Sequence, residues 1–151
     1  MRLSGAGLQL LKSAEGFCGR SYLDVAGVQT IGYGHRLLRG ETYPDGISHA
    51  DGEAILAGDV REAEEAVQRL VKVPLTQGQF DALVDFVFNL GATRLAGSTL
   101  LKYLNAAKYD SAAWQLLAWD HAGSREVAGL KKRREAEFQL WAPTAQQESA
   151  A

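Results

Sequence analysis

One long amphipathic helix constrains most strongly how this chain can fold. Ser48 has the character of an N-cap with Asp51 as its capping-box partner, and Pro74 sets the far limit. Between them, apolar residues recur every three or four positions, at Leu56, Val60, Ala63, Val67 and Leu70. The predicted helix over 49–72 is about 36 Å long at ~1.5 Å per residue. A helix of that length can connect two lobes of a small protein.

The segment before this helix favours strands instead. Between Arg20 and Leu37, strand-forming residues are interrupted by Gly27, Gly32 and Gly34. The pattern predicts a short hairpin that turns at Asp24–Gly27, followed by a loop. Ahead of the hairpin, residues 8–14 predict a short helix that breaks at Glu15–Gly16.

The chain after Pro74 reads as helical. Thr76 and Gln79 form a second capping box before an apolar helix that ends at Gly91. Further helices are expected over 98–106, over 111–119 with Ser111 as its cap, and over 130–141 before Pro143. The sequence therefore predicts an α+β fold in one domain, residues 1–145. It comprises a small β-containing lobe (15–50), the linking helix, a helical lobe (75–142 plus the N-terminal helix) and a flexible tail (146–151).

Composition narrows the class of protein. The 151 residues are 46% apolar and 23% charged with a net charge of −2, which argues against a nucleic-acid partner. The single cysteine, Cys18, cannot form an internal disulfide. No stretch approaches the ~20 apolar residues of a membrane span, and Lys12 and Glu15 interrupt any signal-peptide core. We expect synthesis in the cytoplasm without membrane insertion.

Three polar residues stand where the first helix meets the hairpin: Glu15, Asp24 and Thr30. Glycoside hydrolysis requires a protonated carboxyl to donate to the leaving oxygen and an ionised carboxylate on the other side of the bond. A threonine hydroxyl can hold a water molecule. The spacing alone is weak evidence, since most carboxylates of a soluble protein are solvated surface charges.

The surrounding motif is more specific. Thr30-Ile31-Gly32-Tyr33-Gly34-His35, preceded by Glu15-Gly16 and Tyr22-Leu23-Asp24, resembles the phage-type lysozymes of glycoside hydrolase family 24, and the endolysins of lambda-like phages in particular. Similar matches, in order, cover about residues 8–142. They are Gln79–Val84, Phe88–Gly91, Ser98–Leu101, Leu104-Asn105, Gly129-Leu130, Arg133–Glu135 and Leu140-Trp141.

The resemblance implies a lysozyme-like fold and hydrolysis of the β-1,4 bond between N-acetylmuramic acid and N-acetylglucosamine, without a cofactor or metal. It makes Glu15 the acid, while Asp24 and Thr30 position the attacking water. The family generally inverts the anomeric centre, which predicts carboxyl groups about 6.5–9.5 Å apart. Glu15 must carry a proton to act, and Phe17, Tyr22 or Phe88 could supply an apolar wall that favours this form.

Other residues receive roles from their place in the motifs. Phe88 and Asn89 end the core helix where the family has its cleft, and we expect them to contact the sugar, with Tyr33 and Arg36 as weaker candidates. His35 is expected to have a structural role, with Asp59 as its hydrogen-bond partner.

Other candidate residues of the sequence have simpler explanations. His35, His49, His121 and Cys18 show no metal-ligand spacing, which disfavours a zinc amidase, and Cys18 lacks the local signature of a peptidase nucleophile. Lys131–Arg134 is interpreted as a solvated helical face beside Glu135 and Glu137. The three tryptophans are assigned to the core, namely Trp114, Trp119 and Trp141.

The resemblance also implies a biological setting. The partner is the glycan strand of peptidoglycan, the role is lysis of the host cell late in a phage cycle, and release to the periplasm and wall requires a holin-type pore. We expect a monomer. The rivals are a catalytically weak wall-binding module and a peptidoglycan peptidase that uses Cys18, and the intact Glu15, Asp24 and Thr30 argue against the first.

Overall fold

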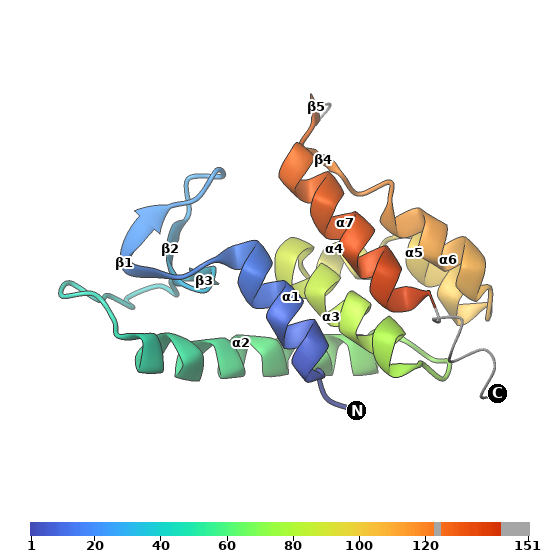
Figure 1. Ribbon diagram of the computed structural model, residues 1–151, viewed down its shortest axis with the longest axis horizontal. Coiled ribbons are helices and arrows are strands. Elements are labelled where there is room, and N and C mark those ends of the chain that lie inside the picture. The colour runs from blue at the N-terminus through green and yellow to red at the C-terminus, as the bar shows by residue number, and fades with distance from the viewer. Residues whose placement is uncertain (123–124, 143–151) are drawn as a thin grey trace.

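The computed structural model describes residues 1–122 and 125–142. It places a small sheet at one end of a long helix, α2, and a group of helices at the other end (Figure 1). The helices are α1 (Gly5–Glu15), α2 (His49–Leu70), α3 (Gln77–Leu90), α4 (Ala92–Ala96), α5 (Thr99–Asn105), α6 (Tyr109–Leu116) and α7 (Ala128–Trp141). The strands are β1 (Cys18–Leu23), β2 (Gln29–Gly32), β3 (His35–Arg36), β4 (His121–Ala122) and β5 (Arg125–Glu126).

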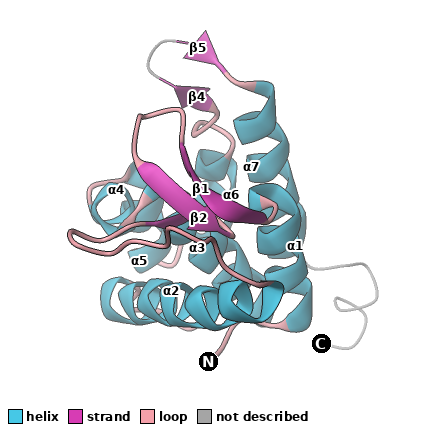
Figure 2. Ribbon diagram, turned by 90° about the vertical axis from the view of Figure 1, so that its left-hand side faces the viewer, coloured by secondary structure: helices cyan, strands magenta, loops and turns pink. Residues whose placement is uncertain are grey.

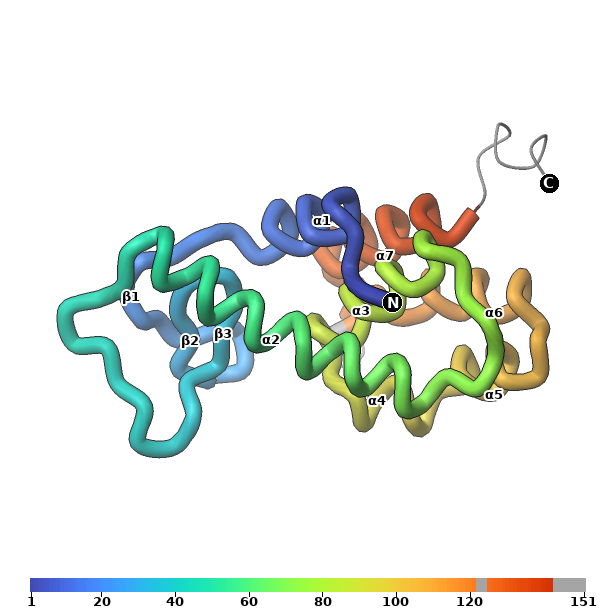
Figure 3. Tube along the Cα trace, turned by 90° about the horizontal axis from the view of Figure 1, so that it is seen from below, coloured from blue at the N-terminus to red at the C-terminus, as the bar shows by residue number. Residues whose placement is uncertain are grey.

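The helix α2 confirms the connecting role that its sequence predicts. Ser48 accepts from the backbone N–H of Asp51, whose side chain accepts from the backbone of Ser48 in return, so the capping box is complete. One face buries Leu56, Val60, Ala63 and Val67. Seen from below, α2 runs from the sheet to the helices of the opposite end (Figure 3). It ends at Leu70, two residues before the predicted limit.

The sheet is antiparallel with the order β1-β2-β3, and its hairpin turns where the sequence predicts. Tyr22 pairs with Thr30, and Thr30 pairs in turn with Arg36. An irregularity in β1 lies between Cys18 and Tyr22. This register places Thr30 on the central strand, with Tyr22 and Arg36 as its neighbours on either side.

The helix α3 is the centre of the helical part and packs against α1, α2 and α7. Thr76 and Gln79 complete its capping box, and every residue from Gln79 to Val87 is buried. The end-on view shows α1 and α7 on one side of the molecule, behind the sheet (Figure 2). At Gly78, an added Cβ would collide with the backbone carbonyl oxygen of Leu140 in α7. The glycine thus permits the close approach of α3 and α7.

Several predicted boundaries were wrong. α1 begins at Gly5 because the Ser4 side chain accepts from the backbone of Gly7. α6 begins at Tyr109 after Lys108, which makes no side-chain cap bond, so Ser111 lies inside this helix. α4 and the β4–β5 pair were not predicted, since segments of five and two residues carry too little periodicity. Pro143 and the predicted tail lie outside the described residues.

The tryptophans do not share one environment. Trp141 is buried, and Trp119 packs edge-on against Phe86 with ring centroids 5.5 Å apart. Trp114 is 64% exposed, so its assignment to the core was wrong. Its ring lies over Phe138 at 5.1 Å, at the outer surface of α6 and α7.

Among the helices described, none has the length and apolar character needed to cross a membrane.

Candidate active site

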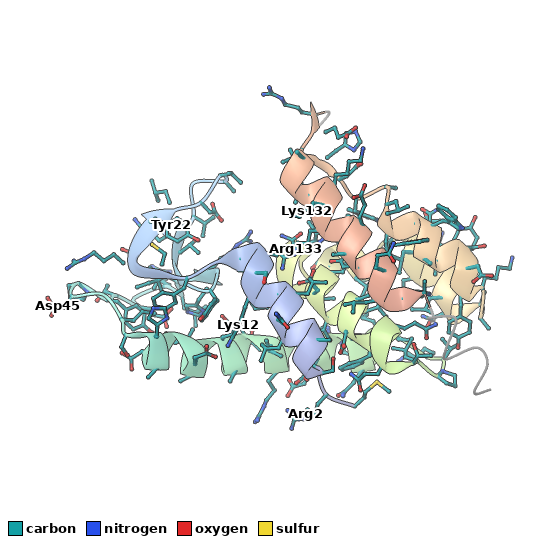
Figure 4. The ribbon with its side chains drawn as sticks, in the orientation of Figure 1. Arg2, Lys12, Tyr22, Asp45, Lys132 and Arg133 are labelled. Atoms are coloured by element: carbon teal, nitrogen blue, oxygen red, sulfur yellow. The ribbon has the colours of Figure 1, made fainter. Side chains whose placement is uncertain are left out.

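Glu15 is the last residue of α1, and its carboxylate points at α7. The helix stops there because Gly16 adopts a positive φ of 67°. Glu15 Oε1 accepts a hydrogen bond from Arg133 Nη1 at 2.7 Å. Figure 4 shows Arg133 reaching from α7 toward the end of α1. The carboxyl group is therefore held at the junction of three elements: α1, the sheet and α7.

Arg133 itself is fixed from behind by Asp85 of α3. Its Nε and Nη2 donate to the two oxygens of Asp85, each at 2.9 Å, which is the two-pronged geometry that guanidinium and carboxylate favour. Burial lowers the pKa of Arg133, but Asp85 and Glu15 outweigh burial and raise the pKa, so the guanidinium remains charged. The guanidinium thus orients Glu15 while its own charge is matched by Asp85.

Gly34 leaves the space that the Glu15 carboxyl occupies. An added Cβ at this position would overlap Glu15 Oε2. The backbone of Gly34 also has a positive φ of 71°, which strains any other L-residue. Gly34 therefore serves both the turn between β2 and β3 and the close approach of Glu15.

Asp24 is anchored by the turn that it opens. Its Oδ1 accepts from the backbone N–H groups of Ala26 and Val28, both at 2.9 Å. Its Oδ2 lies 3.7 Å from Nε of Arg36, which is itself largely exposed. One oxygen thus holds the loop, and the other can accept a hydrogen bond from a further group.

Thr30 is only 3% exposed and lies on β2. Its hydroxyl donates to the backbone carbonyl of Val28 at 2.9 Å. Since that bond uses the only hydroxyl proton, the oxygen lone pairs remain available to accept from a water molecule.

Of the three aromatic residues considered as a wall beside Glu15, Tyr22 lies near enough for Glu15 to affect its pKa. Burial, followed by the nearby Glu15, Cys18 and Asp24, raises the pKa of Tyr22. Phe17 instead stacks on His49 with ring centroids 3.9 Å apart and packs against Tyr33 at 5.2 Å.

Tyr33 belongs to this packing and not to the groove described next. Its hydroxyl lies 3.3 Å from Glu53, and the ammonium group of Lys12 lies over its ring. Tyr33 therefore attaches the sheet to α2, and its sugar contact stays a prediction.

A groove of about 370 Å³ lies between the sheet, α2 and the end of α3. It brings together Arg36, Phe88 and Asn89, which the sequence proposed as sugar contacts. Gly34, the neighbour of the Glu15 carboxyl, also lines it. A mixed apolar and polar lining of this kind suits a sugar, which presents apolar ring faces and polar hydroxyl groups.

His35 has the structural partner that the sequence predicted, and a second one. Its Nδ1 lies 2.7 Å from Asp59 and its Nε2 lies 2.8 Å from Glu41. Because carboxylates only accept, both ring nitrogens must carry protons for the two bonds to form, so His35 is charged here. Burial lowers the pKa of His35, but the bonds to Glu41 and Asp59 outweigh burial and raise the pKa. Burial raises the pKa of Asp59.

We expect Asp59→Asn to lower the free energy of unfolding by about 1–2 kcal/mol near pH 6. The effect is smaller than for a fully buried pair because both side chains are partly exposed to solvent. A raised histidine pKa contributes stability that is present below the unfolded value of about 6.5 and is lost as pH rises through the folded value. The difference between variant and wild type should therefore shrink toward pH 9.

Urea unfolding across this pH range measures the effect, and an NMR titration of His35 reports its pKa directly. The exposed loop variant Asp45→Asn is the matched control and should show no such trend. A constant difference at every pH would contradict a charged pair.

Two residues at the site were missed by sequence reasoning: Arg133, the partner of Glu15, and Asp85, the partner of Arg133. Lys131–Arg134 was taken for a solvated face, but only Lys131 and Lys132 are exposed, whereas Arg133 and Arg134 are buried. Glu137, placed on the same face, is buried as well. The signal that could have found Arg133 is Asp85, a carboxylate in the middle of a largely apolar helix, since a buried charge needs a partner.

Comparison with known proteins identifies relatives of this chain by sequence and by fold. The phage lysozyme family matches residues 12–137. The endolysin of Bacillus phage B103 is 43% identical over 144 residues, which cover 93% of this chain and 54% of that protein. The endolysin of Salmonella phage P22 is 38% identical over 137 residues, which cover 89% of this chain and 94% of the P22 protein.

A solved structure has the same fold. The muramidase domain of SpmX from Asticaccaulis excentricus superposes with a TM-score of 0.84 at 33% sequence identity, and the match covers 95% of this chain and 99% of that domain. The chain spans about half the length of the Bacillus phage relative and nearly all of the P22 endolysin and the SpmX domain. The chain belongs to the phage lysozyme family.

Proposed function

We propose that this chain is an endolysin-type muramidase that hydrolyses the β-1,4 bond between N-acetylmuramic acid and N-acetylglucosamine in peptidoglycan. The observation that supports the proposal is the Glu15 carboxyl against Gly34, which lines a groove with sugar-compatible lining. Tyr22 connects the three residues, because Glu15 and Asp24 both contribute to its raised pKa and it pairs with Thr30 in the sheet. The phage lysozyme family and its endolysin relatives support the reaction class.

Glu15 is the general acid in this proposal. Its carboxyl donates a proton to the glycosidic oxygen as the bond to the anomeric carbon breaks. Arg133 holds Oε1, and Gly34 gives Oε2 its space on the side of the groove. The proton would therefore leave from Oε2, while the bond to Arg133 fixes the orientation of the group.

Asp24 and Thr30 position the attacking water. Asp24 Oδ2 accepts one proton of the water, and the Thr30 oxygen accepts a hydrogen bond from the other. The turn and the Val28 carbonyl hold these two groups in place before substrate arrives. A water that attacks opposite the leaving group inverts the anomeric centre, which requires carboxyl groups about 6.5–9.5 Å apart.

Arg36, Phe88 and Asn89 contact the sugar chain in the groove. The Phe88 ring offers an apolar surface to a sugar face, and the side chains of Arg36 and Asn89 can hydrogen-bond to its hydroxyl and acetamido groups. In the cell, the protein acts as a monomer in host lysis and reaches the wall through a holin-type pore.

Product analysis on purified peptidoglycan tests the proposal. We expect new reducing ends and no new free amines from wild type and from Cys18→Ser, and the first product seen by proton NMR should carry the inverted anomer. Free amines that disappear in Cys18→Ser would show a peptidase instead. The geometry disfavours that reading, because Cys18 Sγ donates to the carbonyl of Arg20 and both nitrogens of His35 are engaged by carboxylates.

A further inference from the structure

Behind Glu15 lies a cluster of charged residues that the proposed mechanism does not yet explain. Three carboxyl groups, those of Glu15, Asp85 and Glu137, meet two guanidinium groups, those of Arg133 and Arg134. The side chains of Asp85, Arg134 and Glu137 have no exposed surface. Asp85 and Glu137 are therefore two buried carboxyl groups in contact, and their mutual repulsion would be costly in a protein interior if both were ionised.

The two oxygens of Glu137 have different surroundings. Oε1 accepts from Arg134 Nη2 at 2.8 Å. Oε2 is buried and receives no N–H or O–H from the described residues. Asp85 lies within hydrogen-bond reach of this carboxyl group, but a carboxylate offers only acceptor oxygens. A proton on Oε2 turns this contact into a hydrogen bond, because Glu137 then donates to Asp85.

We propose that Glu137 is a neutral carboxylic acid in the folded enzyme and a positioning residue for Glu15. Its proton joins Oε2 to Asp85, Asp85 presents both oxygens to Arg133, and Arg133 holds Glu15. The inference rests on the proposed muramidase function only for the role of Glu15. Glu137 in α7 thus acts on Glu15 at the end of α1 through Asp85 in α3 and Arg133.

Several observations explain why the proton resides on Glu137. Glu15 keeps 18% of its side chain exposed to solvent, and Asp85 accepts two bonds from the guanidinium of Arg133. Glu137 has no exposed surface, and among the described residues Oε2 has no donor. Burial, followed by the bond to Asp85, raises the pKa of Glu137 well above the ordinary value.

Arg133 keeps carboxyl partners without a charge on Glu137, whereas the buried Nε and Nη1 of Arg134 find no acceptor among the described residues. Arg133 is paired with Asp85 and Glu15, as described. Arg134 lies over the Phe86 ring at 5.3 Å and donates to the side-chain oxygen of Asn89 at 2.8 Å.

Other charged groups on the elements around Glu137 are directed elsewhere. On α3, Asp81 is held by Ser4 and Gln77. On α1, Lys12 pairs with Glu53 of α2. On α6, Asp110 is exposed, as is Glu135 on α7 itself. The groups that act on Glu137 are therefore Asp85, Arg134 and Arg133.

Two substitutions separate a neutral Glu137 from an ionised one. Gln at position 137 keeps one donor for Asp85 and one acceptor for Arg134, and it carries no charge. We expect Glu137→Gln to retain wild-type kcat and the wild-type pH profile. Glu137→Leu removes the donor, and we expect kcat to fall about tenfold as Arg133 and Glu15 lose their fixed geometry. Glu135→Gln is the matched control on the same helix.

An NMR measurement tests the protonation state without relying on activity. In protein labelled with 13C at glutamate side chains, the Glu137 carboxyl signal is identified by its loss in Glu137→Gln. We expect the shift of a protonated carboxyl that stays constant from about pH 5 to pH 8, whereas free glutamate ionises near 4.3. The unfolding midpoint of Glu137→Gln should rise relative to wild type as pH rises, since only wild type takes up this proton on folding.

Three results would overturn the proposal. A carboxylate signal at neutral pH, or a displaced high-pH limb of kcat/KM in Glu137→Gln, would show that Glu137 is ionised. Full activity in a folded Glu137→Leu would remove its positioning role. If wild type released no reducing ends, the muramidase function would fail, but the carboxyl signal would still decide the protonation of Glu137.

Discussion

Glu15→Gln is expected to lower kcat/KM on purified peptidoglycan by about 10³-fold, the usual contribution of a general acid. Gln has the size of Glu and can still accept from Arg133, but its amide cannot deliver a proton to the leaving oxygen. The substrate groove is unchanged, so binding to peptidoglycan should persist. The measurement is the rate of reducing-end release compared with wild type.

Stability controls make this result interpretable. Arg133 keeps both bonds to Asp85 when Glu15 loses its charge, so we expect the free energy of unfolding to change by less than about 1 kcal/mol. Glu65→Gln, on the exposed face of α2, should leave both rate and stability at wild-type values. A Glu15→Gln protein that hydrolyses at the wild-type rate would exclude Glu15 as the acid.

The second large effect concerns stability at the contact between α3 and α7. We expect Gly78→Ala to lower the free energy of unfolding by about 3 kcal/mol, because the added methyl group meets the backbone carbonyl of Leu140. Backbone cannot rotate aside as a side chain can, so the end of α7 must shift. Thermal or urea unfolding measures the loss.

Gly58→Ala provides the matched comparison. Gly58 lies in the middle of α2, is exposed, and has nothing within 4 Å of an added Cβ. There the same substitution should raise the free energy of unfolding by about 0.5–1 kcal/mol through the better helix propensity of Ala. Equal effects at both positions would show that the α3–α7 contact does not depend on Gly78.

The features that the sequence determined by itself are local in origin. The capping boxes at Ser48 and Thr76 set where α2 and α3 begin, because each motif satisfies its own backbone donors. The hairpin turn at Asp24 is likewise fixed within a few residues, by bonds from its side chain to Ala26 and Val28. Glu15, Asp24 and Thr30 could be predicted as a set because they stand close together in a segment that resembles the phage lysozymes.

Only the tertiary structure decided which distant charges meet. Arg133 is 118 positions from Glu15 and 48 positions from Asp85, and no local periodicity records such pairings. For the same reason Lys131–Arg134 looked like a solvated face, although helix packing buries its second half. Glu41 joined His35 and Asp59 from a loop without regular structure. Local hydrogen bonds are determined by neighbouring residues, whereas the partner of a buried charge is determined only when the helices pack.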